Sequence, residues 1–238
     1  MNRPIGLAAL TVLELPHEEQ IRVAAQAGYT HVGLRLVPVA GQPYQHSFDV
    51  SAVERTLVEH GVRVLDVEVF RLTPETKFAD FEAVLEASAR LKATELLVHG
   101  ADPDESRLAK TFGALCDLAA RYGLAANLEP MPWVDVSNVA KAMRIIDLAA
   151  RPNGGLLVDA IHFFRGGDTP QVLSSVPSTR LRYAQPICEP GFAAKIPPVQ
   201  TPIEGLQVAD TCFYYPEDRG ISESVRLAKE MAARLPTP

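Results

Sequence analysis

Short apolar runs alternate along the chain with longer segments in which apolar residues recur every three or four positions. The apolar runs are rich in Val, Ile and Leu, and they occupy residues 4–10, 31–37, 63–70, 94–100, 124–130, 154–163 and 181–188. Near-continuous apolar runs of this length are typical of strands that are buried on both faces of a parallel sheet. The pattern therefore predicts seven such strands.

The longer segments between these runs predict amphipathic helices. Their residues are 18–28, 50–61, 78–93, 105–123 and 137–151. In the fourth segment, Leu108 and Phe112 begin an apolar face with helical spacing. Gly28, Gly61 and Gly123 each follow a periodic stretch and precede the next predicted strand. A glycine in the left-handed conformation commonly ends a helix at this point.

The regular repeat of one strand and one helix predicts an α/β protein with a parallel sheet covered by helices. An open doubly wound sheet is the competing architecture, but it usually has a glycine-rich turn after its first strand. The sequence PIGLAALTVLELP, at residues 4–16, has no such turn. We therefore predict a (β/α)8 TIM barrel that forms a single domain over residues 1–238, although barrels usually have about 250 residues.

The repeat becomes irregular after about residue 190, which predicts an atypical or incomplete C-terminal part. The segment 190–205 contains four prolines and is interpreted as a loop. Residues 206–215 are the candidate eighth strand, and residues 222–235 are predicted to form a terminal helix. A barrel that closes incompletely leaves strand edges exposed, so a homodimer that covers them is a further expectation.

Charge and composition exclude several classes of partner. The net charge is −6 and no block of Lys or Arg is present, which argues against a protein that binds nucleic acid. No apolar run approaches the roughly 20 residues of a membrane span, and no signal peptide is recognised. Cys116, Cys188 and Cys212 form no CxxC pair. Reduced thiols in a cytoplasmic protein are the simplest interpretation.

Polar residues gather at the ends of the predicted strands, and these ends meet at one face of a barrel. Two carboxylates and an amide oxygen there, from Glu129, Asp159 and Gln185, would suit Mg²⁺ or Mn²⁺. Glu129 is also the candidate proton carrier. The candidate substrate-binding residues are Arg35, Glu68, Arg71, His99 and Trp133. Structural roles remain open for them, namely ion pairs for the arginines, an ordinary hydrogen bond for His99 and core packing for Trp133.

Three runs carry a family resemblance, namely ANLEPMPW (126–133), GGLLVDAIHF (154–163) and RYAQ (182–185). In this order and spacing they resemble the sugar phosphate isomerase/epimerase branch of the xylose isomerase-like TIM barrels. The resemblance implies that Glu129 both binds the metal and acts as an acid/base. It further implies that Asp159 and Gln185 are metal ligands and that His162 contacts the substrate.

The resemblance implies a metal-dependent isomerase or epimerase of carbohydrate metabolism, acting on a small keto-sugar, polyol or hydroxy-acid. Two departures matter: relatives often have an Asp shortly after the seventh-strand Gln, whereas this sequence has Glu189 at a different spacing. More seriously, the family has a Glu on the eighth strand, whereas residues 206–215 contain Asp210 and no Glu. Glu204 and Glu217 flank this segment without a matching motif. Two alternatives therefore remain open. One is a dehydratase that uses the same metal site, and the other is a degenerate barrel that binds a metabolite without catalysis.

Overall fold

The computed structural model of the chain describes residues 6–39, 41 and 44–185. The predicted C-terminal loop, the candidate eighth strand and the terminal helix lie outside the described residues. In the described part, no helix combines the length and the apolar character that a membrane crossing requires.

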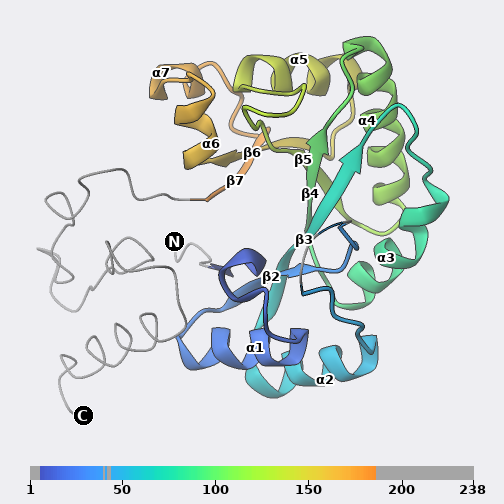
Figure 1. Cartoon of the computed structure of the whole chain (residues 1–238), viewed down its shortest axis with the longest axis vertical. Coiled ribbons are helices and arrows are strands. Elements are labelled where there is room, and N and C mark those ends of the chain that lie inside the picture. The colour runs from blue at the N-terminus through green and yellow to red at the C-terminus, as the bar shows by residue number, and fades with distance from the viewer. Residues whose placement is uncertain (1–5, 40, 42–43, 186–238) are drawn as a thin grey trace, which may run out of the picture.

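Seven parallel strands form one curved sheet, in which each strand pairs with its neighbours in sequence order. The strands are β1 (Gly6–Leu7), β2 (His31–Arg35), β3 (Arg63–Leu72), β4 (Glu95–Gly100), β5 (Ala125–Leu128), β6 (Gly154–Asp159) and β7 (Leu181–Gln185). Helices alternate with the strands and cover the convex side of the sheet (Figure 1). The chain thus has the predicted TIM-barrel-like α/β fold, of which the described residues form a half-barrel.

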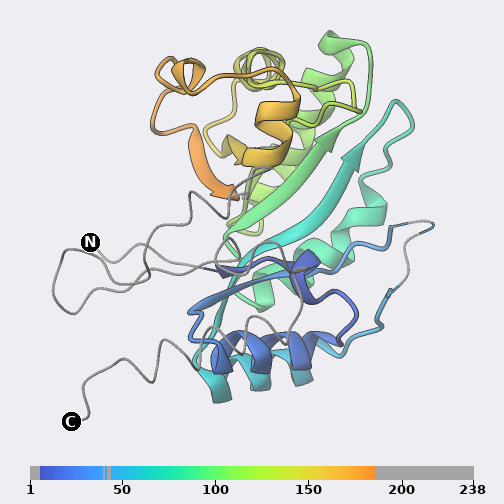
Figure 2. The ribbon, with the colours of Figure 1, turned by 60° about the vertical axis from the view of Figure 1, so that its left-hand side comes forward.

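Five of the helices match the predicted segments to within a few residues at each end. The helical elements are η1 (Ala9–Val12), α1 (His17–Gln26), α2 (Val50–His60), α3 (Ala79–Arg90), α4 (Glu105–Ala120), α5 (Val139–Ala149), α6 (Ala160–Arg165) and α7 (Pro170–Leu173). Helices α1 and α2 pack together at one end of the sheet, and α4 and α5 pack together towards the other (Figures 1 and 2). Gly28, Gly61 and Gly123 have positive φ angles, as predicted.

Two of the apolar runs contain a strand that is followed by a helical element. The first run leaves the sheet after Leu7 and continues as the 3₁₀-helix η1. The sixth run changes into α6 at Asp159, whose side chain accepts hydrogen bonds from the backbone N–H groups of Ile161 and His162. A capping carboxylate thus starts a helix inside a run whose apolar character alone predicted a longer strand.

Side chains along each strand point alternately to the hydrophobic core, under the helices, and to the inside of the barrel, and β4 is an example. Leu96 and Val98 are fully buried in the core, which is shared with the helices. Glu95, Leu97 and His99 alternate with them and therefore point to the opposite face, towards the inside of the barrel. The inside of such a barrel is usually filled by branched apolar side chains. Here it carries mostly polar ones.

Strand periodicity and register place every candidate site residue that lies in a strand on this inner face. Residues on the inner face include Gly33, Arg35, Asp66, Glu68, Arg71, Glu95, Leu97, His99, Asn127, Gly155, Leu157, Asp159, Tyr183 and Gln185. Glu129, a further candidate, directly follows β5. A polar inner face converging on the carboxyl ends of the strands is the arrangement that a barrel active site requires.

Candidate functional site

Glu129, Asp159 and His162 form a cluster at the carboxyl ends of β5 and β6. Each offers one possible metal-ligand atom, and these three atoms lie within 4.8 Å of one another. Glu129 directly follows β5, Asp159 ends β6, and His162 lies in the first turn of α6. Because β5 and β6 are adjacent and α6 begins directly after Asp159, the local fold brings the three side chains together.

Asp159 is held in place by the helix that it caps. Its Oδ1 accepts hydrogen bonds from the backbone N–H groups of Ile161, at 2.7 Å, and His162, at 3.1 Å. Its Oδ2 accepts no hydrogen bond from any residue that the structure describes. One carboxylate oxygen therefore fixes the side chain, and the other remains available to a ligand in the site.

The His162 ring has a buried nitrogen without a partner. Its Nδ1 lies out of contact with solvent and makes no hydrogen bond within the described part of the chain. The Trp133 ring packs edge-on against the imidazole, with 4.7 Å between the ring centroids, and is itself 62% exposed. Trp133 is thus a wall beside His162 and not a core residue. Leaving a buried polar atom unpaired is costly, so a metal ion or a substrate group is a fitting partner for this ring.

Glu129 and His99 form a buried pair next to this cluster. His99 Nε2 lies 2.7 Å from Glu129 Oε2, and Glu129 is only 4% exposed. Burial, and then the charge of Asp159, raises the pKa of Glu129 to about 7. Burial, and then the charges of Arg71 and Arg35, lowers the pKa of His99 to about 4. At neutral pH the imidazole is therefore uncharged. It donates to an ionised Glu129 in the tautomer that carries the proton on Nε2, and it accepts from a protonated Glu129 in the other tautomer, so this contact serves both protonation states of the carboxyl group.

Arg35 and Glu68 are placed against each other on the inner face of β2 and β3. Arg35 donates to Glu68 Oε1 through its Nη2, at 2.7 Å, and through its Nε, at 3.1 Å. Both side chains are largely buried, with 11% and 3% exposed. Burial raises the pKa of Glu68, and the charge of Arg35 opposes that rise. The two predicted substrate-binding residues thus satisfy each other, as in the structural alternative left open for the arginines.

Arg71 lies beside His99 at the mouth of the half-barrel. The two residues are partners in the register of β3 and β4, so their side chains lie on the same face. Arg71 is exposed, and no carboxylate in the described ranges pairs with it. This leaves an unneutralised cation next to the site, in a position suited to an acidic group of a substrate.

Gln185 ends β7 directly opposite Asp159. The two are register partners on neighbouring strands, and Gln185 is half-buried. The structure therefore places the amide on the same face as the Asp159 carboxylate. Its role as a metal ligand remains a prediction.

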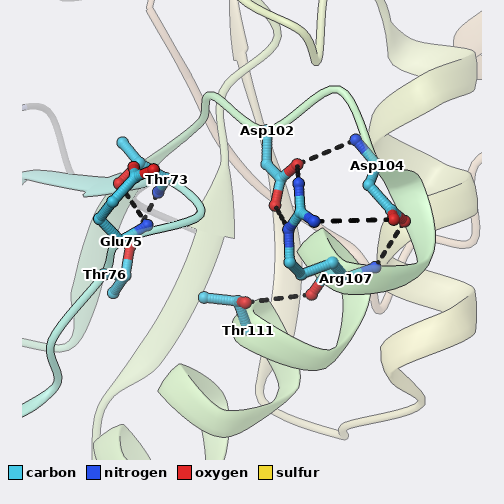
Figure 3. Close-up of polar contacts among 7 residues, drawn as sticks. All are labelled: Thr73, Glu75, Thr76, Asp102, Asp104, Arg107 and Thr111. Atoms are coloured by element: carbon cyan, nitrogen blue, oxygen red, sulfur yellow. Dashed lines mark hydrogen bonds and ion pairs between the residues drawn. The ribbon is translucent and has the colours of Figure 1, made fainter.

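Two loops beside the site are stiffened by side-chain hydrogen bonds (Figure 3). After β4, Asp102 is buried and accepts two hydrogen bonds from the Arg107 guanidinium, both at 2.7 Å. After β3, Thr76 Oγ1 accepts a hydrogen bond from the backbone N–H of Thr73. Neither loop was singled out in the sequence. The two loops follow the strands that carry Arg71 and His99.

A further polar layer that the sequence analysis did not identify lies on the inner face of the sheet. It consists of two hydrogen-bonded groups: Tyr183 donates to Asp66, and Asn127 and Arg182 both donate to Glu95. Burial, and then the charge of Glu68, raises the pKa of Asp66 to about 7. The alternation in DVEVF, residues 66–70, was a signal that places Asp66 on the same face as Glu68.

Comparison with known proteins identifies the family. The model of the xylose isomerase-like TIM barrel family matches residues 21–211. No curated protein sequence matches the chain. The chain is similar to a solved structure of IOLI protein with a binding zinc atom, at 16% identity over 97% of each chain and a TM-score of 0.69.

Two further solved structures share the fold. D-allulose 3-epimerase from Methylomonas sp., solved in complex with D-allulose, is 21% identical, with 75% of this chain and 70% of that chain covered and a TM-score of 0.59. A xylose isomerase-like TIM barrel/4-hydroxyphenylpyruvate dioxygenase fusion protein is 18% identical over 75% of this chain, with a TM-score of 0.63. The chain spans 30% of the length of that fusion protein. From the family match, this chain belongs to the xylose isomerase-like TIM barrel family.

Proposed function

We propose that the protein is a divalent-metal-dependent isomerase or epimerase that acts on a small keto-sugar, polyol or hydroxy-acid. The observation that carries this proposal is the cluster of Glu129, Asp159 and His162, in which one carboxyl group has its pKa raised to about 7. Family membership supports it. Two proteins of the same fold also support the proposal, one described with a zinc atom and the other in complex with D-allulose.

The metal would be held by Glu129 and Asp159, with Gln185 as the third protein ligand. His162 lies close enough either to join this set or to meet a substrate oxygen. An imidazole beside two carboxylates suits Mn²⁺ better than Mg²⁺, so Mn²⁺ is the ion to test first. A divalent ion held by these residues would supply Lewis-acid chemistry, which would make a C–H beside a substrate carbonyl more acidic.

The remaining chemistry belongs to side chains of the chain itself. In an isomerisation, Glu129 takes the proton from the carbon beside the substrate carbonyl and returns it to the neighbouring carbon on the same face. An epimerisation would need a second acid group on the opposite face. The His99 N–H holds the Glu129 carboxylate in one orientation. Trp133 and His162 border the space beside it. Arg71 favours the acidic substrates in the proposed class, because it lies next to His99 and has no carboxylate partner among the described residues.

Replacing Asp159 by Asn tests the metal site directly. Protein freed of metal by a chelator should bind Mn²⁺ in calorimetry, and Asp159→Asn should weaken binding by at least about 100-fold, because a charged ligand is lost. Asn is also a good helix N-cap, so the variant should fold. The control is Asp117→Asn, which removes an exposed carboxylate paired with Arg151 and should bind Mn²⁺ as the parent does. No binding by the parent would overturn the proposal and favour the non-catalytic barrel.

Mn²⁺ binding should also depend on pH. The ion has to displace the proton of Glu129, whose pKa is about 7, so binding should weaken by about tenfold for each pH unit below 7 and level off above it. Calorimetry between about pH 5.5 and 8.5 measures this slope. In Glu129→Gln, which has no proton to displace, the slope should be much reduced. An equal slope in both proteins would show that another group controls binding.

A dehydratase that uses the same site is the second candidate. The observation that favours it is the absence of Glu from residues 206–215, because elimination requires only one carboxylate base, whereas a two-base epimerisation requires a second. The products separate the two reactions. Elimination releases water and gives a conjugated product with new ultraviolet absorbance, and isomerisation conserves the mass of the substrate.

A further inference from the structure

β7 contains one residue more than the strand beside it. Leu156 pairs with Leu181, but the next residue, Leu157, pairs with Tyr183, so Arg182 is extra. Leu156 belongs to the hydrophobic core outside the barrel, and Leu181 lies on the same face. In a regular strand, side chains alternate between the faces, and Gln185, four residues after Leu181, would also point outside. The bulge at Arg182 reverses this phase and turns Gln185 inside.

Two contacts hold the bulged strand across the inside of the barrel. The Tyr183 hydroxyl donates a hydrogen bond to Asp66 Oδ2 at 2.8 Å. Arg182 Nη2 lies 3.0 Å from Glu95 Oε1 in an ion pair. Asp66 and Glu95 are themselves register partners on β3 and β4. Arg182 and Tyr183, which are consecutive residues of β7, therefore both point inside. Their partners, Glu95 and Asp66, lie side by side on β4 and β3, which are not neighbours of β7 in the sheet.

Each of these contacts depends on a glycine. A Cβ at Gly155 would lie 2.4 Å from Arg182 Cγ and 2.5 Å from Asn127 Oδ1. A Cβ at Gly33 would lie 2.4 Å from Asp66 Oδ1. Contacts this short are not tolerated, so side chains at these two positions would displace the groups that hold β7.

We propose that Asp66 and Glu95 are positioning residues for the metal site. Through Tyr183 and Arg182 they keep β7 in its bulged register, and this register places Gln185 opposite Asp159. The inference rests on the proposed function, because it gives Gln185 the role of a metal ligand. The inference goes further by explaining why Gln185 lies where it does. Among the described residues, β7 pairs only with β6, so contacts other than a second neighbouring strand have to fix its register.

Removing a single hydroxyl tests the inference. Tyr183→Phe should weaken Mn²⁺ binding by about 10–100-fold in calorimetry, the effect typical of groups that orient a ligand. In a Gln185→Ala background the same change should have no further effect, because the ligand that it positions is absent. Asp66→Asn should bind nearly as the parent does, since its amide oxygen still accepts from Tyr183, and Asp66→Ala should resemble Tyr183→Phe. Tyr122→Phe, on the far side of the sheet, is the control.

The outcomes separate the inference from the function on which it rests. If the parent binds no Mn²⁺, both fail. If Asp159→Asn abolishes binding but Gln185→Ala or Tyr183→Phe does not weaken it, the positioning role fails and the proposed metal site stands. Equal weakening by Tyr183→Phe with and without Gln185 would show a general structural effect and would also overturn the inference. If circular dichroism shows that Tyr183→Phe does not fold, Arg182→Gln, which breaks the partly exposed contact with Glu95, takes its place in the same two backgrounds.

Discussion

Glu129→Gln is expected to lower turnover by about 10²–10⁴-fold, the range that general acid–base catalysis contributes. Gln has nearly the same shape and can still accept the hydrogen bond from His99, but it cannot take up the substrate proton. The measurement is the exchange of the substrate C–H in D₂O, followed by NMR with keto-sugars and hydroxy-acids that the parent converts. Saturating Mn²⁺ separates the loss of proton transfer from the loss of a metal ligand.

The control for this variant is Glu105→Gln, on the outer surface. Glu105 is an exposed carboxylate of α4 that pairs with Arg144, and its replacement should leave exchange unchanged. If Glu129→Gln exchanged the substrate proton at the rate of the parent, Glu129 would not be the acid/base. Asp66, a second buried carboxyl group of the described residues with a pKa raised to about 7, would then be the next candidate.

The periodicity of the sequence predicted most of the fold. Five helices and seven strands follow from apolar spacing, since packing against a single sheet dictates that spacing. Helix α6 was missed because its residues continue an apolar run, and only the capping by Asp159 separates it from β6. A short buried helix and a buried strand have the same composition, so periodicity cannot distinguish them.

The candidate site was predictable only in part, because some of its features depend on contacts between residues that are distant in the chain. Strand ends meet in a barrel, so Glu129, Asp159 and His162 were expected to lie together from their order in the chain. The pairing of Arg35 with Glu68 was only one of the possibilities that the sequence allowed. The bulge of β7 gave no signal in the sequence, because its causes are contacts with Asp66 and Glu95, which are distant in the chain. Register depends on such tertiary contacts, and a local pattern does not contain them.

Because the inside of the half-barrel is polar, the free energy of unfolding depends on how its buried charged groups are paired. Glu68 and Asp66 are buried carboxyl groups of one strand, and burial raises the pKa of both. Arg35 is the cation that opposes this effect at Glu68. A buried ion pair adds little net stability, but the removal of one partner leaves a charge that is neither hydrated nor neutralised. The largest stability effect is therefore expected at Arg35.

Arg35→Met is expected to lower the free energy of unfolding by about 3–5 kcal/mol at about pH 8. Met fills much of the space of the arginine stem, so the loss reports the uncompensated Glu68 carboxylate and not a cavity. Urea unfolding followed by circular dichroism measures the effect. The control is Arg90→Met, which breaks the exposed pair with Glu54 and should cost less than about 1 kcal/mol.

The pH dependence of this loss identifies its cause. Without Arg35, the folded-state pKa of Glu68 rises further above its unfolded value, so the folded variant keeps a proton that the unfolded chain releases. A carboxyl group shifted in this direction favours folding at low pH and loses that contribution as the pH rises through its folded pKa. The destabilisation should therefore be smaller at about pH 5 than at about pH 8. Arg35→Met combined with Glu68→Gln should recover most of the stability and lose the pH dependence. A loss that is equal at both pH values and persists in the double variant would instead identify packing by the arginine stem as its origin.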